Sequence, residues 1–296
     1  MTAPSVSVVI ITRDRRPELL QTLDRLQDLV GGREFRELVV VDNASTDGSA
    51  AAVRERFPDV RVLALPENLA AAGRTVGARA TDADLVAFAD DDSWWEAGAL
   101  PLAADLFRTH ARLGLLHARI VVHPGERTDP VCLQMARGWH KAGTPGPAVL
   151  GHLACGVVVR REAYLGVGGY DRTLGVGGEE RLLALDLAAA GWDQAYVEDV
   201  VAHHQPSASR EAAPRRRARC RRNDCLTAVL RLPAGRAARE CAGFVREAGR
   251  DPASRAELLP FLRRLPRALA RRRPVPAEVV EQLRRAEATA FSGSRV

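Results

Sequence analysis

Short apolar runs alternate with amphipathic stretches along the first third of the chain. The run at residues 5–11 is rich in Val and Ile and predicts a buried strand, and the leucine spacing after Pro17 predicts a helix to residue 30. The same patterns predict strands at 37–41, 60–65 and 85–89, and helices at 49–57 and 70–81. Alternating strands and helices indicate an α/β fold with a Rossmann-like, mostly parallel sheet flanked by helices.

The alternation becomes less regular beyond residue 97. We expect a helix at 97–112, strands at 115–122, 154–159 and 195–202, a helix at 181–190, and two loops, at 123–147 and 166–178. A boundary near 205–207 separates this part from a segment that is rich in arginine and predicted to be mainly helical. The predicted organisation is one domain over 1–206, with halves at about 1–97 and 98–206, and a basic extension over 207–296.

Polar side chains follow each of the first four predicted strands. They are Thr12 and Asp14, then Asp42 and Asn43, then Asn68, and then the triplet Asp90, Asp91 and Asp92. In a parallel sheet, ligands bind beyond the carboxyl ends of the strands, so we expect one composite site there. Three adjacent carboxylates suit a hard divalent cation such as Mg²⁺ or Mn²⁺. A solvated acidic turn is the alternative for the triplet alone.

The charge of the chain is distributed unevenly. Residues 207–296 contain 22 arginines and nine acidic residues, a balance of +13, so the first 206 residues carry −7. Such asymmetry can indicate an anionic partner, but the aromatic content of 5% and the lack of a recognisable motif disfavour nucleic acid. The five cysteines form no C-x-x-C pair, which disfavours a zinc site and a disulfide framework.

No apolar stretch reaches the roughly 18 residues that a membrane-spanning helix needs. The N-terminus also lacks the pattern of a signal peptide. We therefore expect a cytoplasmic location, with peripheral contact at the inner face of the membrane as an extension of it. Homo-oligomers are compatible with the sequence.

Several motifs together resemble one known family. The segments are VVIITR at 8–13, VVDNASTDGS at 40–49, Asn68 with GRTVG at 73–77, FADDD at 88–92, GGYD at 168–171, GEE at 178–180, and His203-His204. In their order and spacing they resemble an inverting family 2 glycosyltransferase with the GT-A fold, over roughly residues 5–205. The resemblance implies a nucleotide-diphosphate sugar donor, bound in the first half, and a hydroxyl acceptor, bound in the second.

The resemblance also implies roles for individual residues. It places Thr12, Asp14 and Asp42 at the nucleoside, Asn68, Arg74 and Thr75 near the nucleotide, Asp90 and Asp91 at the donor, and Asp92, with Asp90, His203 and His204, at a Mn²⁺ or Mg²⁺ ion. An aspartate can accept a hydrogen bond from uracil or thymine N3–H, which favours UDP- or dTDP-sugars. From the residues alone, Asp42 could instead cap a turn, Arg74 could form a surface ion pair, and either histidine could be structural.

Inversion requires a base that removes the proton of the acceptor hydroxyl. Glu180 is our candidate, with Glu179 as the second choice, since these two residues stand where the family has its acidic pair. The family usually has aspartate at the second position and an acidic residue where this chain has Leu182. These departures leave open whether the acceptor is a glycan, a lipid-linked glycan or a small molecule.

The Q-x-x-R-W signature of processive members is absent, which indicates single additions. Two other classes remain as alternatives: a nucleotidyltransferase, which should show a Gly-rich phosphate loop with lysine after the first strand, and a non-catalytic binding module that uses the basic extension. Within that extension, leucines between 258 and 269 form a stripe among arginines, a pattern that can lie on an anionic bilayer. Pro260, Pro266 and Pro274 interrupt the stripe and favour a segment packed on the domain.

Overall fold

The apolar run after Ser5 forms the central strand of the parallel part of the sheet in the computed structural model, which describes residues 3–31, 34–207 and 212–292. The parallel strands are β1 (Val6–Thr12), β2 (Glu37–Asp42), β3 (Arg61–Ala64) and β4 (Leu85–Asp90). They lie in the order β3-β2-β1-β4. The register places Thr12 beside Asp42 and Ile11 beside Asp90, so the polar ends of three strands meet at one edge.

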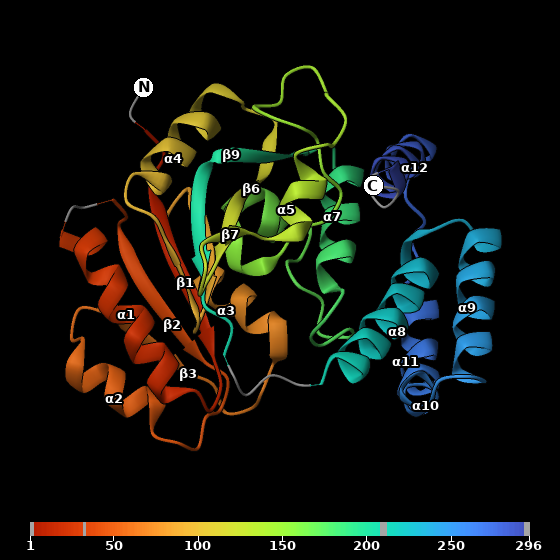
Figure 1. Cartoon of the computed structure of the whole chain (residues 1–296), viewed down its shortest axis with the longest axis horizontal. Coiled ribbons are helices and arrows are strands. Elements are labelled where there is room, and N and C mark those ends of the chain that lie inside the picture. The colour runs from red at the N-terminus through yellow and green to blue at the C-terminus, as the bar shows by residue number, and fades with distance from the viewer. Residues whose placement is uncertain (1–2, 32–33, 208–211, 293–296) are drawn as a thin grey trace.

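Helices cover both faces of this sheet, as the alternation predicted (Figure 1). They are α1 (Arg16–Gly31), α2 (Ser49–Arg56), and α3 (Gly73–Ala80), which follows a 3₁₀ turn, η1 (Ala70–Ala72). Alternate side chains of β1 enter different cores: Ile10 packs with Leu19 and Leu23 of α1, whereas Val9 packs with Ala78 of α3. This period of two is the reason that the strand is apolar throughout.

The second half of the sheet is mixed rather than parallel. Its elements are β5 (Ser93–Trp95), α4 (Ala99–Thr109), β6 (Leu113–Val122), β7 (Arg127–Thr128), α5 (Pro130–Met135), η2 (Ala154–Gly156), β8 (Val157–Arg160), α6 (Arg161–Gly166), α7 (Glu179–Ala189) and β9 (Asp193–His204). Strand β8 is antiparallel to both β4 and β6, while β9 is parallel to β6 and antiparallel to β5. The GT-A class of fold is confirmed by the structural similarities described below.

The structure corrects the predicted elements at several places. The expected loop at 123–147 contains β7 and α5, and residues 154–156 form a 3₁₀ turn before the strand. Strand β5 and helix α6 were not expected, because they are too short to show a period of their own. The carboxyl end of β9 extends to His204, so that it pairs with β5 directly after the aspartate triplet.

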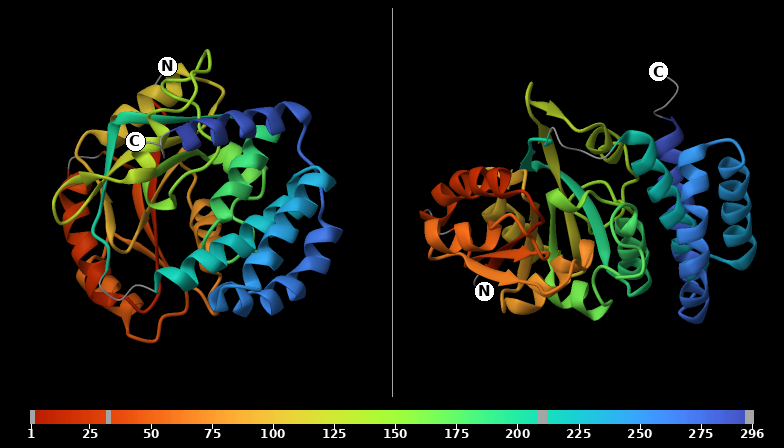
Figure 2. Two further views of the ribbon diagram at one scale, coloured as in Figure 1. Left: turned by 45° about the vertical axis from the view of Figure 1, so that its right-hand side comes forward. Right: turned by 90° about the horizontal axis from the view of Figure 1, so that it is seen from below.

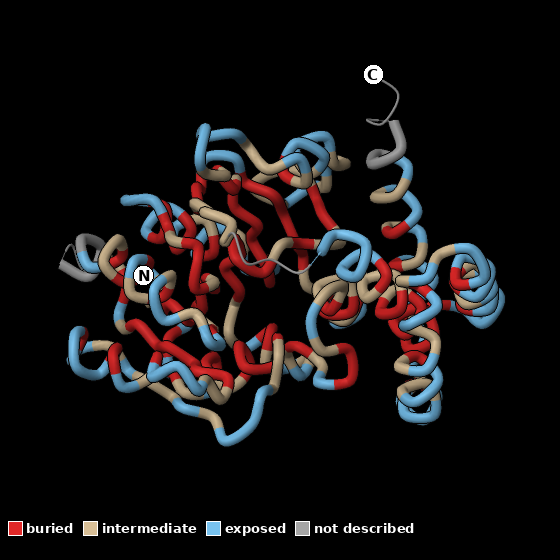
Figure 3. Tube along the Cα trace, turned by 60° about the horizontal axis from the view of Figure 1, so that its bottom comes forward, coloured by how far each residue is buried: buried red, intermediate tan, exposed pale blue. Residues whose placement is uncertain are grey.

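The C-terminal segment forms helices that pack against α7 (Figures 1 and 2). They are α8 (Ala213–Arg231), α9 (Ala234–Ala248), α10 (Pro252–Ala256), α11 (Leu258–Ala270) and α12 (Ala277–Ser292). Leu182 and Leu185 of α7 are buried among apolar residues of these helices. The departure from an acidic residue at Leu182 therefore has a packing reason. Figure 3 shows buried segments along the sheet and along the inner sides of the helices.

Two expectations about this segment can be compared with the structure. Helix α11 (Leu258–Ala270) contains Pro260 and Pro266, so these two prolines do not break it, whereas Pro274 lies beyond its end. Across the described part of the chain, no helix combines the length and the apolar character that crossing a bilayer requires.

Candidate active site

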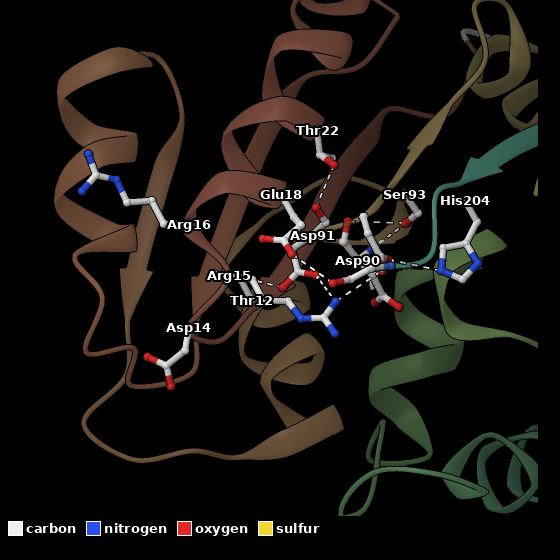
Figure 4. A network of polar contacts seen from close by, with 12 residues as sticks. Thr12, Asp14, Arg15, Arg16, Glu18, Thr22, Asp90, Asp91, Ser93 and His204 are labelled. Atoms are coloured by element: carbon white, nitrogen blue, oxygen red, sulfur yellow. Dashed lines mark hydrogen bonds and ion pairs between the residues drawn. The ribbon is translucent and has the colours of Figure 1, made fainter. Parts of the chain in front are cut away.

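The aspartate triplet at the end of β4 is tied to the end of β1. The Thr12 hydroxyl donates a hydrogen bond to Asp91 Oδ2 at 2.9 Å, and the Thr22 hydroxyl of α1 donates to the Asp91 carbonyl at 2.8 Å (Figure 4). Thr12 is buried, so its hydroxyl orients Asp91. Burial raises the pKa of Asp91 to about 7, against the opposing charge of Arg15.

Arg15 is a component of the site that the sequence analysis missed. Its Nη1 lies 3.1 Å from Asp91 Oδ1 and 3.2 Å from Asp92 Oδ2, so one guanidinium partly neutralises two of the three carboxylates. The residue lies just before α1, within the polar stretch that follows β1. That stretch holds three arginines, Arg13, Arg15 and Arg16, and the pattern alone cannot tell which of them turns inward.

Asp92 lies against the end of β9. Its Oδ1 is 3.3 Å from His204 Nε2, and its Oδ2 accepts a hydrogen bond from the backbone N–H of Ser207 at 3.3 Å. Burial alone would raise the pKa of Asp92. The hydrogen bond from His204, together with the charges of His204 and Arg15, instead lowers that pKa below its ordinary value. Asp92 is thus held as a carboxylate.

His203 points away from Asp92, because successive side chains of a strand alternate in direction. Its Nε2 lies 3.2 Å from Glu96 Oε2, its Nδ1 lies 3.0 Å from His123 Nε2, and its ring stacks on Trp94 at 5.2 Å. The Arg25 guanidinium lies 3.8 Å from the centre of the same Trp94 ring. The structure therefore brings His204, and not His203, to the aspartate triplet.

Arg74 of α3 connects the triplet with the second half of the domain. Its buried guanidinium forms an ion pair with Asp90 and lies 5.7 Å from the centre of the Tyr170 ring. Burial opposes the charge, but Asp90, Tyr170 and the Glu179–Glu180 pair raise the pKa of Arg74 above its ordinary value. The surface ion pair that the residues left open for Arg74 is excluded by this burial.

Glu179 and Glu180 begin α7, after Gly178 in the left-handed conformation, with φ of 87°. Glu180 is half-buried, and its Oε2 accepts a hydrogen bond from the Gly178 backbone N–H at 3.1 Å. Glu179 is only 3% exposed, and its Oε2 has no hydrogen-bond partner among the described residues. Burial raises the pKa of both carboxyls, and for Glu179 the nearby Glu180 raises it further.

Four other predicted residues shape turns and packing around the site. Asp42 is buried and accepts from the Ser45 backbone N–H at 2.9 Å, Asp14 is exposed and accepts from Thr46 N–H at 2.7 Å, and Asn68 is exposed and accepts from Ala70 N–H at 2.8 Å. Thr75 is buried, 2.8 Å from the Tyr164 hydroxyl, and accepts from the Tyr170 backbone N–H. Thr75 therefore holds α3 to the loop at 166–178 that contains Tyr170.

Known proteins are similar to this chain in sequence and in fold. Residues 7–163 match the model of glycosyl transferase family 2. The chain belongs to glycosyl transferase family 2. This assignment disfavours both the nucleotidyltransferase and the binding module, and makes the protein a glycosyltransferase. An N-acetylglucosaminyl-diphospho-decaprenol L-rhamnosyltransferase of Mycobacterium tuberculosis is 30% identical, over 67% of this chain and 75% of the relative.

Solved glycosyltransferases are similar in structure at low sequence identity. GalNAc-T7, crystallised with UDP, GalNAc and Mn²⁺, matches with a TM-score of 0.59 at 14% identity, over 79% of this chain and 49% of its own. The mannosyltransferase PcManGT from Pyrobaculum calidifontis, in complex with GDP-Man and Mn²⁺, matches with a TM-score of 0.53 at 21% identity, over 99% and 80%. At such identities these similarities establish the shared fold.

The donor set at Asp92 is compatible with the metal that this glycosyltransferase family implies. Among the described residues, no group of three or more His, Cys, Asp or Glu side chains is arranged to hold a metal ion. Asp92 and His204 nevertheless present an oxygen and a nitrogen donor side by side, and Mg²⁺ or Mn²⁺ commonly combines one or two carboxylates with phosphate oxygens of the substrate. The chemistry of these two residues therefore fits a divalent cation.

Proposed function

We propose that this glycosyltransferase moves a sugar, with inversion and in single additions, from a UDP- or dTDP-sugar to a hydroxyl of a lipid-linked glycan, and that a divalent metal is required. The observation that carries the proposal is the position of buried Arg74, whose charge acts on Asp90 at one side and on the Glu179–Glu180 pair at the other. We therefore assign the donor-side carboxylates and this pair of acids, whose pKa values are raised, to one site. The mycobacterial relative, named for a lipid-linked acceptor, supports the acceptor class.

The nucleoside would lie over the ends of β1 and β2. Asp42 is held there by a hydrogen bond from the Ser45 backbone N–H to its Oδ1. A buried carboxylate at this place can accept from the N3–H of uracil or thymine. Cytosine has no hydrogen on N3, so it would leave Asp42 without this hydrogen bond.

Asp92 and His204 would hold the metal ion. When bound, the ion supplies charge that stabilises the diphosphate leaving group. Arg15 neutralises part of the charge on Asp91 and Asp92, and this reduces the repulsion among three adjacent aspartates at a partly buried edge of the sheet. Thr12 and Thr22 fix the orientation of Asp91 through its carboxylate and its carbonyl.

Glu180 would act as the base. It is half-buried rather than enclosed, so its carboxylate can meet an acceptor hydroxyl, and the Gly178 N–H holds one of its oxygens in place. A carboxyl with a raised pKa is a stronger base than an exposed one. Glu179 is enclosed and its pKa is raised by burial and by Glu180, so it would remain protonated while Glu180 carries the charge.

A donor survey tests this function. The purified protein would be incubated with UDP-, dTDP- and GDP-sugars, including a deoxyhexose donor, together with a polyprenyl-diphosphate N-acetylglucosamine acceptor. Release of nucleoside diphosphate and elongation of the acceptor would be measured with Mn²⁺, with Mg²⁺ and with EDTA. We expect metal-dependent transfer from a uridine or thymidine donor and an inverted anomeric configuration by NMR. Full activity in EDTA would remove the metal from the proposal, and a retained configuration would remove Glu180 as the base.

A further inference from the structure

Helix α11 has two apolar faces, and the fold uses only one of them. Phe261 and Ala268 are buried, and Leu258 and Leu265 pack with them against residues of α8 and α9. Phe261 meets Phe244 of α9 with ring centroids 5.7 Å apart. This inner face anchors the helix to the protein, so its other positions are free to serve a different purpose.

The second apolar face is exposed to solvent. Leu259, Leu262 and Leu269 are 55%, 56% and 54% exposed, and exposed Pro266 lies between the last two. Residues 262, 266 and 269 follow Leu259 by three, seven and ten positions, and this helical spacing places all four side chains on one side of the helix. We name these four residues the leucine stripe. A helix of 13 residues is about 20 Å long, so the stripe extends along most of that length.

Unpaired positive charge lies beside the leucine stripe. Arg263 and Arg267 are exposed on the same helix, and Arg273 follows its end. Among the described residues, none of these three side chains has a carboxylate within ion-pair distance. Arginines of the same segment that lie against the rest of the protein form ion pairs instead: Arg222 pairs with Glu257, and Arg231 pairs with Asp186. The excess positive charge of the C-terminal segment is thus left without a partner at α11.

We propose that α11 docks this protein on an anionic lipid surface, with the leucine stripe entering the boundary of the acyl chains and the neighbouring arginines contacting lipid phosphates. An apolar stripe beside arginines is the pattern of helices that lie in the membrane interface, where buried apolar area and attraction to anionic lipids add. Arginines near such a surface are attracted to it electrostatically, and salt weakens this attraction.

The docking inference extends the proposed function but is tested without turnover. The full chain would be sedimented with vesicles of phosphatidylcholine alone and of phosphatidylcholine with phosphatidylglycerol, at low and at high salt. We expect binding to the anionic vesicles at low salt and loss of binding at high salt. Failure of this binding would overturn the docking inference and leave sugar transfer untouched, whereas failure of transfer would leave the binding result valid.

Two variants and one control locate the surface. The variant L259S/L262S/L269S and the variant R263E/R267E should each lose affinity for anionic vesicles by about tenfold or more. Both change exposed side chains, so the fold should be kept, which circular dichroism would verify. Leu133→Ser on α5 removes an equally exposed leucine, 54% exposed, and should bind as the parent does. Unchanged binding by the serine variant would overturn the inference.

A competing occupant of the leucine stripe is a second copy of this chain. Light scattering without lipid would show a dimer in that case, and L259S/L262S/L269S would convert it to a monomer. A dimer that dissociates in this variant and does not bind vesicles would overturn the membrane assignment. If parent and variant have the same oligomeric state, and only the parent binds vesicles, the membrane assignment is supported.

Discussion

His204 Nε2 lies 3.3 Å from Asp92 Oδ1 and joins the end of β9 to the end of β4. The neighbouring His203 faces Glu96 and His123 instead. The contact depends on β5, which follows the aspartate triplet and pairs with β9, so that Ser93 stands beside His204 and Trp94 beside His203. Two adjacent histidines are thereby assigned to two different environments.

Because His203 and His204 contact different residues, we expect different effects when each is replaced. His204→Ala should reduce metal-dependent transfer by about 100-fold or more, since it removes a candidate ligand of the ion. His203→Ala should reduce transfer much less, because its ring contacts Trp94 rather than Asp92. Initial rates across a Mn²⁺ titration would compare the variants, with Asp92→Asn as the reference for a lost ligand. Equal losses for both histidines would contradict the assignment.

The acid pair at the start of α7 predicts a second contrast. Glu180→Gln should reduce transfer by about 100-fold or more, because an amide cannot accept the proton of the acceptor hydroxyl. Glu179→Gln should be milder, since an amide resembles the protonated carboxyl that we expect at this enclosed position. Nucleotide affinity, measured by calorimetry, should stay close to the parent value in both. If only Glu179→Gln loses transfer, the two roles are reversed.

The raised pKa of the acid pair predicts how transfer depends on pH. A base must be deprotonated, and burial raises the pKa of both carboxyls, so kcat/KM should fall as the pH decreases through a value above that of an ordinary glutamate. The positive charge of Arg74 lowers both pKa values. Arg74→Gln should therefore move this acidic limb to higher pH, whatever it does to the maximal rate. A limb that stays in place would show that Arg74 does not act on the base.

A close approach between α3 and the sheet predicts an effect on stability. A Cβ at Gly77 would lie 2.4 Å from Val9 Cγ1 and 3.0 Å from Val41 Cγ2, inside the buried contact of α3 with β1 and β2. Gly77→Ala should lower the free energy of unfolding by about 1–3 kcal/mol. Gly235→Ala is the matched control, because the only atom that a Cβ there meets within 4 Å is Nη1 of the flexible Arg239 side chain, at 3.8 Å. The control should raise stability by about 0.5–1 kcal/mol, and urea unfolding would measure both.

The sequence by itself was sufficient for the first half of the fold and for the family. Buried parallel strands such as β1 and β4 are mainly apolar, and polar residues follow each of the four strands. The strands, and the edge where we expect ligands, can therefore be predicted from local pattern. The motif set from Thr12 to Asp92 is also local, which is why it indicates a glycosyltransferase before any contact is known. Short elements such as β5 lacked this signal, because three residues cannot show a period.

Only the tertiary structure decided which side chains meet. Whether Arg15 or Arg16 reaches the aspartates depends on where α1 begins above the sheet, and the choice between His203 and His204 depends on the register of β9 against β5. Helix α11 shows the same limit, since its leucines are alike in sequence, yet Leu265 packs inward and Leu262 is exposed. Such assignments depend on contacts between segments far apart in the chain, and no local pattern of residues encodes them.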